Sequence, residues 1–184
     1  MAARTSEEPL PELVERLRRG EPAALDAAYE QHRAQLYAFL VRMTGQRPLA
    51  EDLLQETWIR LARRARELRP DTNLRAYLFT IARNLVRSHQ RWASVDSVRL
   101  EALAGLEAAA APATPLELAE RRQAQARLEA AIARLPPAAR EVVLLVGVAE
   151  LSPSEAAEVL GERPEATRQR LSRARALLRE ELTR

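Results

Sequence analysis

Apolar side chains recur along most of the chain at the spacing of one helical face, and Pro and Gly interrupt this pattern at intervals. In the first half the pattern predicts helices over 10–19, 22–44, 49–68 and 74–91. In the second half it predicts helices over 121–135, 138–148, 153–160 and 164–182. Residues 93–119, between the halves, are rich in Ala, Pro and Glu and lose the periodicity, which is typical of a flexible linker. We therefore expect an all-α protein with two small helical domains, 1–92 and 120–184, joined by the flexible linker 93–119.

The last two predicted helices have the pattern of a helix-turn-helix. Ser152 is a good N-cap, and Glu155 stands where it would complete a capping box. Pro153 suits the first helical position, and Gly161 ends this short helix. Pro164 begins the last helix after a tight turn.

The last helix has one face that we expect to pack on the core and one that we expect to contact DNA. The inward face consists of Thr167, Leu171, Ala174 and Leu178. The outward face consists of Arg168, Gln169, Ser172 and Arg173, flanked by Arg163 and Arg175. Arginine bonds guanine edges and phosphates, so this face suits the major groove. The alternative is a solvated helix surface in a chain biased towards arginine.

Composition supports the helical prediction and restricts the function. Ala, Leu, Arg and Glu, all strong helix formers, dominate a chain that is 47% hydrophobic and 4% aromatic. It contains no Cys, which excludes disulfides and thiolate metal sites. The N-terminus does not resemble a signal peptide and no run is long and apolar enough to span a membrane, so we expect a cytoplasmic protein without direct membrane insertion. The net charge of +3 hides clusters of arginine in 60–91 and in the last helix.

The predicted fourth helix combines basic and aromatic residues. Arg83, Asn84 and Arg87 are expected on its outer face, with Tyr77 and Phe79 interleaved. Basic groups together with aromatic rings suit single-stranded DNA, because bases stack while phosphates are neutralised. The competing interpretation places both rings in the core.

The predicted third helix carries Asp52, Gln55 and Glu56 on one polar face. Acid–base chemistry, a solvated face and a protein-docking face are all open from these residues alone. We find no phosphate loop, nucleophile elbow or metal cluster, and we expect His32 and His89 to lie on the surface. The sequence therefore predicts no catalytic residues, no metal and no cofactor.

Several segments, in order along the chain, resemble those of bacterial sigma factors. Ala50 to Leu61 resembles their segment that binds polymerase core, and Leu74 to Leu85 resembles their promoter-melting segment. Leu135 to Val142, Leu151 to Gly161 and Arg168 to Arg175 resemble their promoter-reading domain. Two domains without a middle one look like the extracytoplasmic-function (ECF) group.

The resemblance implies specific surfaces and partners. The clamp of the largest RNA polymerase subunit would be bound by Glu51, Asp52, Gln55 and Glu56. The −10 element, partly single-stranded, would be captured by Asp71, Asn73, Tyr77, Arg83, Asn84 and Arg87. The double-stranded −35 element would be read by Arg163, Arg168, Gln169, Arg170, Ser172, Arg173 and Arg175. An anti-sigma protein that covers both domains is a further expected partner.

The turn before the recognition helix departs from the family pattern. This family often has Ile-Pro-Val-Gly-Thr-Val, whereas this chain has Pro164 moved by one position and Glu165 in place of the Gly. We therefore expect the start of this helix to differ from the family pattern by one residue, and we assign base contacts from Arg168 onward rather than to Glu165–Thr167. A stand-alone helix-turn-helix regulator and a sigma-like adaptor that only binds a partner remain alternative hypotheses.

Overall fold

The structure is a computed structural model that describes residues 10–93 and 115–183, and in these two ranges the chain is helical with no strand. The elements are α1 (Leu10–Arg18), α2 (Pro22–Thr44), α3 (Arg47–Arg64), the 3₁₀ turn η1 (Ala65–Glu67), α4 (Leu74–Ala93), α5 (Pro115–Arg134), α6 (Pro137–Gly147), α7 (Pro153–Leu160) and α8 (Pro164–Thr183). The predicted all-α fold, with a helix-turn-helix in its second half, is confirmed. None of the described helices is long and apolar enough to cross a membrane.

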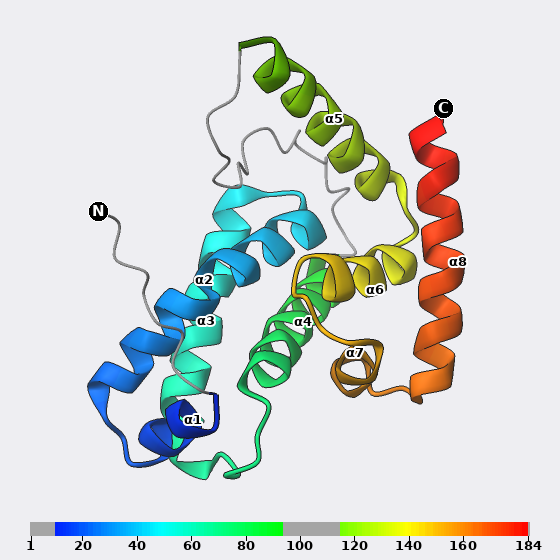
Figure 1. The fold of residues 1–184 in the computed structure, drawn as a ribbon. Coiled ribbons are helices and arrows are strands. Elements are labelled where there is room, and N and C mark those ends of the chain that lie inside the picture. Colours follow the sequence, from blue (N-terminus) through cyan, green and yellow to red (C-terminus); the bar gives the residue numbers. More distant parts are fainter. Residues whose placement is uncertain (1–9, 94–114, 184) are drawn as a thin grey trace.

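Helices α1 to α4 form one group (Figure 1). Large apolar side chains fill the space between them. Phe39 from α2 and Phe79 from α4 are fully buried and meet edge to face, with ring centroids 5.3 Å apart. Burying one such ring contributes roughly 1.5–3 kcal/mol. Of the two rings interleaved with the α4 arginines, Phe79 therefore belongs to the core, while Tyr77 is half-buried at its edge.

Helices α5 to α8 form the second group, in which α8 lies across α6 and beside the end of α5 (Figure 1). Pro136 lies between α5 and α6, and Pro137 is the first residue of α6. The side chain of Arg140 folds back to donate hydrogen bonds to the carbonyls of Ile132, Ala133 and Leu135. These carbonyls lie at the end of α5, where helical backbone donors run out. The Ile132 carbonyl also accepts a bond from the Leu135 amide at 3.2 Å, and Arg140 supplies the further donors.

Two boundaries differ from the sequence prediction by more than two residues. Helix α3 ends at Arg64 and the chain tightens into η1 over Ala65–Glu67, where one α-helix to residue 68 was predicted. Helix α5 begins at Pro115, inside the segment 93–119 that was predicted as linker. Pro is well suited to a first helical turn, and the Leu and Glu residues that follow favour helix. The remainder of the predicted linker, 94–114, lies outside the described residues.

His32 was predicted on the surface, and that prediction is wrong. Its side chain is 0% exposed within α2, and neither ring nitrogen has a hydrogen-bond partner among the described residues. Burial, together with the smaller effect of the nearby positive charge of Arg75, lowers the pKa of His32 to about 4. His89, near the end of α4, is exposed as predicted.

The two groups of helices are in contact with each other. Helix α4 packs against α7, and α2 packs against α5 and α6. Apolar residues of both groups join in one continuous core. Arg42 of α2 and Glu129 of α5 form a buried pair across this boundary, with N–O distances of 2.9 and 2.5 Å. The structure therefore holds the two predicted domains together in one packed arrangement.

Candidate nucleic-acid and protein interfaces

The helix-turn-helix is built by local signals that the structure reproduces. The Ser152 hydroxyl accepts a hydrogen bond from the Glu155 amide at 3.2 Å, and the Glu155 carboxylate accepts one from the Ser152 amide at 2.7 Å. Hydrogen bonding from Ser152 lowers the pKa of Glu155, and Asn73 and Arg75 act in the same direction against the effect of partial burial. Gly161, at φ 68°, ends α7 in the left-handed region, which Gly adopts without strain. The predicted capping box is thus confirmed.

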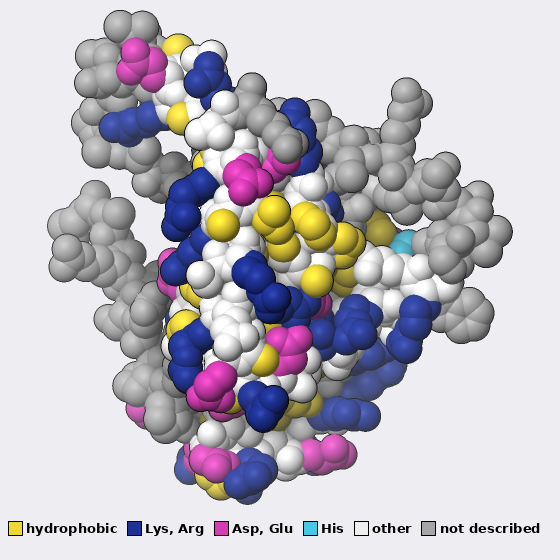
Figure 2. Space-filling model, turned by 90° about the vertical axis from the view of Figure 1, so that its right-hand side faces the viewer, with side chains coloured by type: hydrophobic (Ala, Val, Ile, Leu, Met, Phe, Trp, Pro, Cys, Tyr) yellow, Lys and Arg dark blue, Asp and Glu magenta, His cyan; other side chains and the backbone are white. Residues whose placement is uncertain are grey.

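Helix α8 presents the face that was predicted to read DNA. Thr167, Leu171 and Ala174 are buried and Leu178 is half-buried, as predicted. The exposed set is Arg163, Arg168, Gln169, Ser172, Arg173 and Arg175. Figure 2 looks at the side of the molecule that carries α8 and shows Arg side chains spread over it, with acidic side chains between them. On α8 itself, Glu165 pairs with Arg168 at 2.7 Å.

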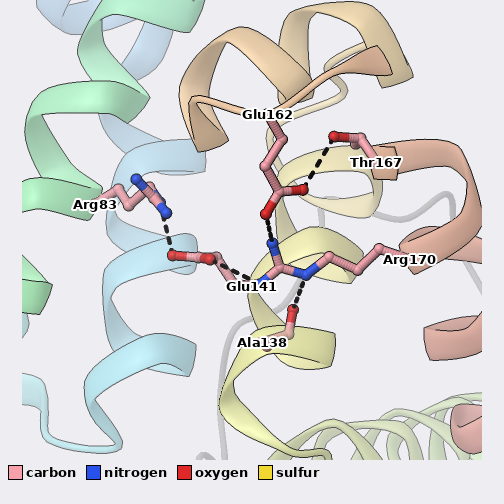
Figure 3. Close-up of polar contacts among 6 residues, drawn as sticks. All are labelled: Arg83, Ala138, Glu141, Glu162, Thr167 and Arg170. Atoms are coloured by element: carbon pink, nitrogen blue, oxygen red, sulfur yellow. Dashed lines mark hydrogen bonds and ion pairs between the residues drawn. The ribbon is translucent and has the colours of Figure 1, made fainter. Parts of the chain in front are cut away.

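Arg170 differs from the rest of the predicted −35 set because its side chain is half-buried at the surface and its guanidinium bonds several other residues of the second domain (Figure 3). It donates to the Ala138 carbonyl at 3.1 Å, to Glu162, and to Glu141 at 3.4 Å. Glu162 also accepts a bond from Thr167 at 3.4 Å. In this structure Arg170 therefore fixes the start of the recognition helix on α6 and on the turn before it. Its contact with DNA stays a prediction.

The loop before α4 borders a cleft of about 280 Å³ at the position predicted to capture the −10 element. The cleft is lined by Arg69, Asp71, Thr72, Asn73, Ala76, Tyr77, Thr80 and Glu158. Asn73 is the N-cap of α4, since its Oδ1 accepts a hydrogen bond from the Ala76 amide at 3.1 Å. Its Nδ2 donates to Glu155 of α7 at 2.5 Å. The structure thus brings Asp71, Asn73 and Tyr77 to one cleft, and α7 closes one side of it.

Arg83 was predicted on the outer face of α4, exposed to DNA, and in this structure it is buried. Its side chain is 8% exposed and its Nε lies 2.8 Å from Glu141 of α6. The position on α4 is the predicted one, but the second domain covers it. Asn84 and Arg87, on the same helix, are exposed as predicted.

The acidic face of α3 is open to solvent. Glu51, Asp52 and Gln55 are exposed, and Glu56 is half-buried and pairs with Arg60 at 2.7 Å. The opposite face of the helix buries Leu53, Trp58 and Leu61. The predicted separation of a polar docking face from a core face is therefore present on this helix.

A neighbouring groove on α2 was missed by the sequence analysis. Tyr29, Arg33, Ala34 and Tyr37 line it together with Leu54 of α3, in a volume of about 280 Å³. The Arg33 guanidinium lies 5.7 Å from the centre of the Tyr29 ring, which in turn packs edge to face on Trp58 at 5.1 Å. Tyr29, Arg33 and Tyr37 repeat at four-residue spacing, so they form one stripe of α2. Their four-residue spacing was the feature of the sequence that could have revealed this groove.

A group of buried or half-buried glutamates at the domain boundary was also missed. They are Glu129 on α5, Glu141 on α6 and Glu155 on α7, and each bonds a residue of the first domain. Glu155 was predicted as part of the capping box, but nothing local marks the contacts of the three with the first domain, because their partners lie 87, 58 and 82 positions away. Among the described residues, no group of acidic and histidine side chains could hold a metal ion.

Comparisons with known proteins agree with the resemblance seen in the sequence. The models of sigma-70 region 2 and sigma-70 region 4 match residues 28–94 and 125–178. The ECF RNA polymerase sigma factor EcfG of Rhodopseudomonas palustris is 34% identical over 145 residues, which cover 78% of this chain and 76% of EcfG. The RNA polymerase sigma factor CarQ of Myxococcus xanthus is 33% identical over 91% of this chain and 94% of CarQ. The ECF sigma factor BldN of Streptomyces coelicolor is 34% identical over 82% of this chain, which spans only 57% of BldN.

Two solved structures have the same arrangement of helices. CnrH in complex with the cytosolic domain of CnrY matches 95% of this chain and 97% of the CnrH chain, with a TM-score of 0.70 and 25% identity. The sigma factor RpoE in complex with the anti-sigma factor NepR, from Bartonella quintana, matches 86% of this chain and 97% of that chain, with a TM-score of 0.64 and 26% identity. On the two domain matches and on full-length relatives such as CarQ, this chain belongs to the ECF group of bacterial sigma factors.

Proposed function

We propose that this chain binds RNA polymerase core and directs it to promoters. In this role α3 docks on the clamp of the largest subunit, α8 reads the −35 element, and the 70–73 loop with α4 captures and helps to melt the −10 element. The protein acts in the cytoplasm and carries out no catalytic step of its own. Polymerase supplies the chemistry, so no cofactor is required here.

The observation that carries this proposal is the presence of an acidic docking face and a basic reading face on opposite domains of one chain. Asp52 and Gln55 are exposed on α3, while Arg168 and Arg173 are exposed on α8. A regulator that only binds duplex DNA has no use for the first face. The relatives EcfG and CarQ are both named RNA polymerase sigma factors, which supports the same conclusion.

The proposal is tested by retention of core polymerase and by transcription. Purified chain is expected to hold core on an affinity column and to start transcription from discrete sites on sheared host DNA. Asp52→Arg should weaken core binding by about tenfold or more. It places a positive charge on the acidic face of α3, which in this proposal meets a basic surface of polymerase. Asp26→Arg, an equal charge change at an exposed position of α2, is the matched control. Failure of the wild-type chain to retain core would overturn the proposal.

A stand-alone helix-turn-helix regulator is the second candidate, and the exposed reading face of α8 is what favours it. It predicts tight, sequence-specific binding to duplex DNA without polymerase, which a gel shift measures directly. The sigma-factor role predicts specific binding only in the presence of core.

We also propose an anti-sigma partner. The Bartonella quintana relative was solved in complex with the anti-sigma factor NepR, and its helices superpose on both domains of this chain. A protein of this kind would contact both domains at once. Co-purification from the native host is the direct test, since such a partner should elute with the chain and depart when core polymerase is added.

A further inference from the structure

The outward face of the recognition helix α8 carries one acid among its basic and polar residues. Between positions 163 and 176 the sequence contains five arginines and a single acid, Glu165. Glu165 lies in the first turn of α8, and its side chain is 70% exposed. The helical period places it in line with Gln169 and Ser172, which follow one and two turns later. An acid therefore stands at the end of the helix whose residues meet base edges in a helix-turn-helix.

The Glu165 carboxylate is bonded to Arg168, a residue of the predicted −35 set. Nη2 of Arg168 donates to Oε1 of Glu165 at 2.7 Å, which is the length of a charge-assisted hydrogen bond. The Arg168 side chain is still 53% exposed, and in the described part of the chain it bonds no other residue. The guanidinium is thus held at one nitrogen, and its other N–H groups remain available to a ligand.

The start of α8, which carries this pair, is itself held on the rest of the second domain. Arg170 donates to the Ala138 carbonyl of α6 at 3.1 Å and to Glu162 in the turn (Figure 3). Glu162 in turn accepts a bond from the buried hydroxyl of Thr167 at 3.4 Å. The backbone beneath the pair is therefore fixed by contacts towards α6 and the turn.

We propose that Glu165 is a positioning residue that holds Arg168 for a guanine, so that one G·C pair of the −35 element is recognised selectively. The inference rests on the proposed function for the identity of that element. Arginine recognises guanine by donating two hydrogen bonds to O6 and N7. An unrestrained arginine turns to a phosphate just as well, and a phosphate contact carries no sequence information. The bond to Glu165 keeps the guanidinium at the base-reading end of α8 and reduces the conformational freedom that binding has to remove.

The negative charge of Glu165 also acts against binding to other sequences. Affinity for DNA of any sequence comes from neutralised phosphates, and a carboxylate on the reading face lowers it. Where guanine is present, the charged contacts of Arg168 offset this cost. Where guanine is absent, the repulsion remains and nothing offsets it. The pair therefore gives discrimination between sequences at the expense of general affinity for DNA.

The variant Glu165→Gln separates this role from a purely structural one. The holoenzyme is offered a pool of one mapped promoter in which the −35 element is randomised, and the bound fragments are sequenced. Wild type is expected to prefer guanine by about tenfold at one position. In Glu165→Gln this preference should fall to about threefold or less, while binding to unrelated duplex DNA tightens by about threefold. An acid that only favours the start of the helix through its charge predicts the opposite, a weaker binding to every sequence alike.

Three further variants complete the test. Arg168→Ala should remove the preference at the same position, and adding Glu165→Gln to it should change the preference no further. Glu165→Gln with Ala166→Glu returns a negative charge to the first turn at a spacing that does not face Arg168, so it should behave as Glu165→Gln alone. Glu180→Gln, the same change at an exposed position near the other end of α8, should keep the wild-type preference.

An unchanged guanine preference in Glu165→Gln would overturn the inference, and so would an equal loss of preference at all positions. A wild type that prefers guanine at no position would overturn it as well. Retention of core is scored separately on the column, so these outcomes leave the proposed function in place. If core is not retained, the proposed function fails and the same pool is offered to the chain alone, because a stand-alone regulator would read DNA with the same face. Absence of any selection in that experiment also contradicts the inference.

Discussion

At the level of single residues, this protein buries several ionisable groups, and each is tolerated for one of two reasons. Arg83 has a carboxylate partner, whereas His32 has no hydrogen-bond partner among the described residues and is buried in its neutral form. An isolated buried charge would cost several kcal/mol, so neutrality is the alternative to pairing. The burial of His32 predicts a dependence of stability on pH.

His32 should make the folded chain less stable in mild acid. Its folded pKa of about 4 lies below the unfolded value of 6.5, so the unfolded chain binds the proton more readily between these two values. The stability that the neutral, buried imidazole allows is fully present above pH 6.5 and is lost as the pH falls towards 4. Between pH 7 and pH 5 the free energy of unfolding should fall by about 2 kcal/mol more in wild type than in His32→Leu. Urea unfolding at the two pH values measures this difference.

The control for that experiment is His89→Leu, at an exposed position of α4. This variant should keep the full pH dependence of the wild type. An equal pH dependence in wild type and in His32→Leu would show that the imidazole does not titrate as its burial requires.

Arg140 should contribute to the stability of the fold through its contacts at the end of α5. Its guanidinium satisfies the carbonyls of Ile132, Ala133 and Leu135 at the end of α5. Arg140→Ala should lower the free energy of unfolding by about 2 kcal/mol, because hydrogen bonds from a charged donor are lost and the carbonyls are left without it. Thermal unfolding compares it with Arg127→Ala, an exposed arginine of α5, which should change little. Equal melting temperatures for the two variants would contradict this role.

At the level of elements, the helix-turn-helix depends on a cap at each end of α7. Ser152→Ala removes the hydroxyl that accepts from the Glu155 amide and should cost about 1 kcal/mol. Ser154→Ala is a matched control, since Ser154 is exposed within the same helix and makes no capping bond. Chemical denaturation of both variants measures the difference, and an equal loss in both would argue against the cap.

Helices were predictable where their signals are local. Ser152, Pro153 and Gly161 fix both ends of α7 through neighbours in the chain, so the sequence prediction and the structure agree there. The start of α5 was misplaced because the Ala- and Pro-rich composition around Pro115 is typical of linkers as well as of helix starts. The break at Ala65 had no visible signal, because the apolar spacing runs through it without interruption.

The candidate surfaces were predictable for the same reason, but only helix by helix. Helical spacing correctly placed Arg168 and Arg173 outward on α8 and Asp52 outward on α3. It also placed Arg83 on the outward face of α4. Arg83 does lie on the outer face of the first domain, but α6 of the second domain packs against this face and buries it. The contacts between domains join residues far apart in the sequence, and a single sequence holds no information on such pairs.

At the level of the whole molecule, Arg83 and Glu141 share one contact but have different expected roles in transcription. Both are needed for this contact between the domains, whereas only Arg83 belongs to the predicted −10 surface. If Arg83 acts through DNA, as the proposed function requires, only the loss of Arg83 should be felt at the promoter.

Arg83→Ala should therefore lower the yield of open promoter complexes by about tenfold, the effect of losing one charged contact to DNA. Glu141→Gln should leave that yield within about twofold, since its amide oxygen still accepts a bond from Arg170. Permanganate footprinting of the holoenzyme on a mapped promoter measures both. If the two variants lose open complexes equally, Arg83 acts through the contact between domains rather than through DNA, and its place on the −10 surface must be given up.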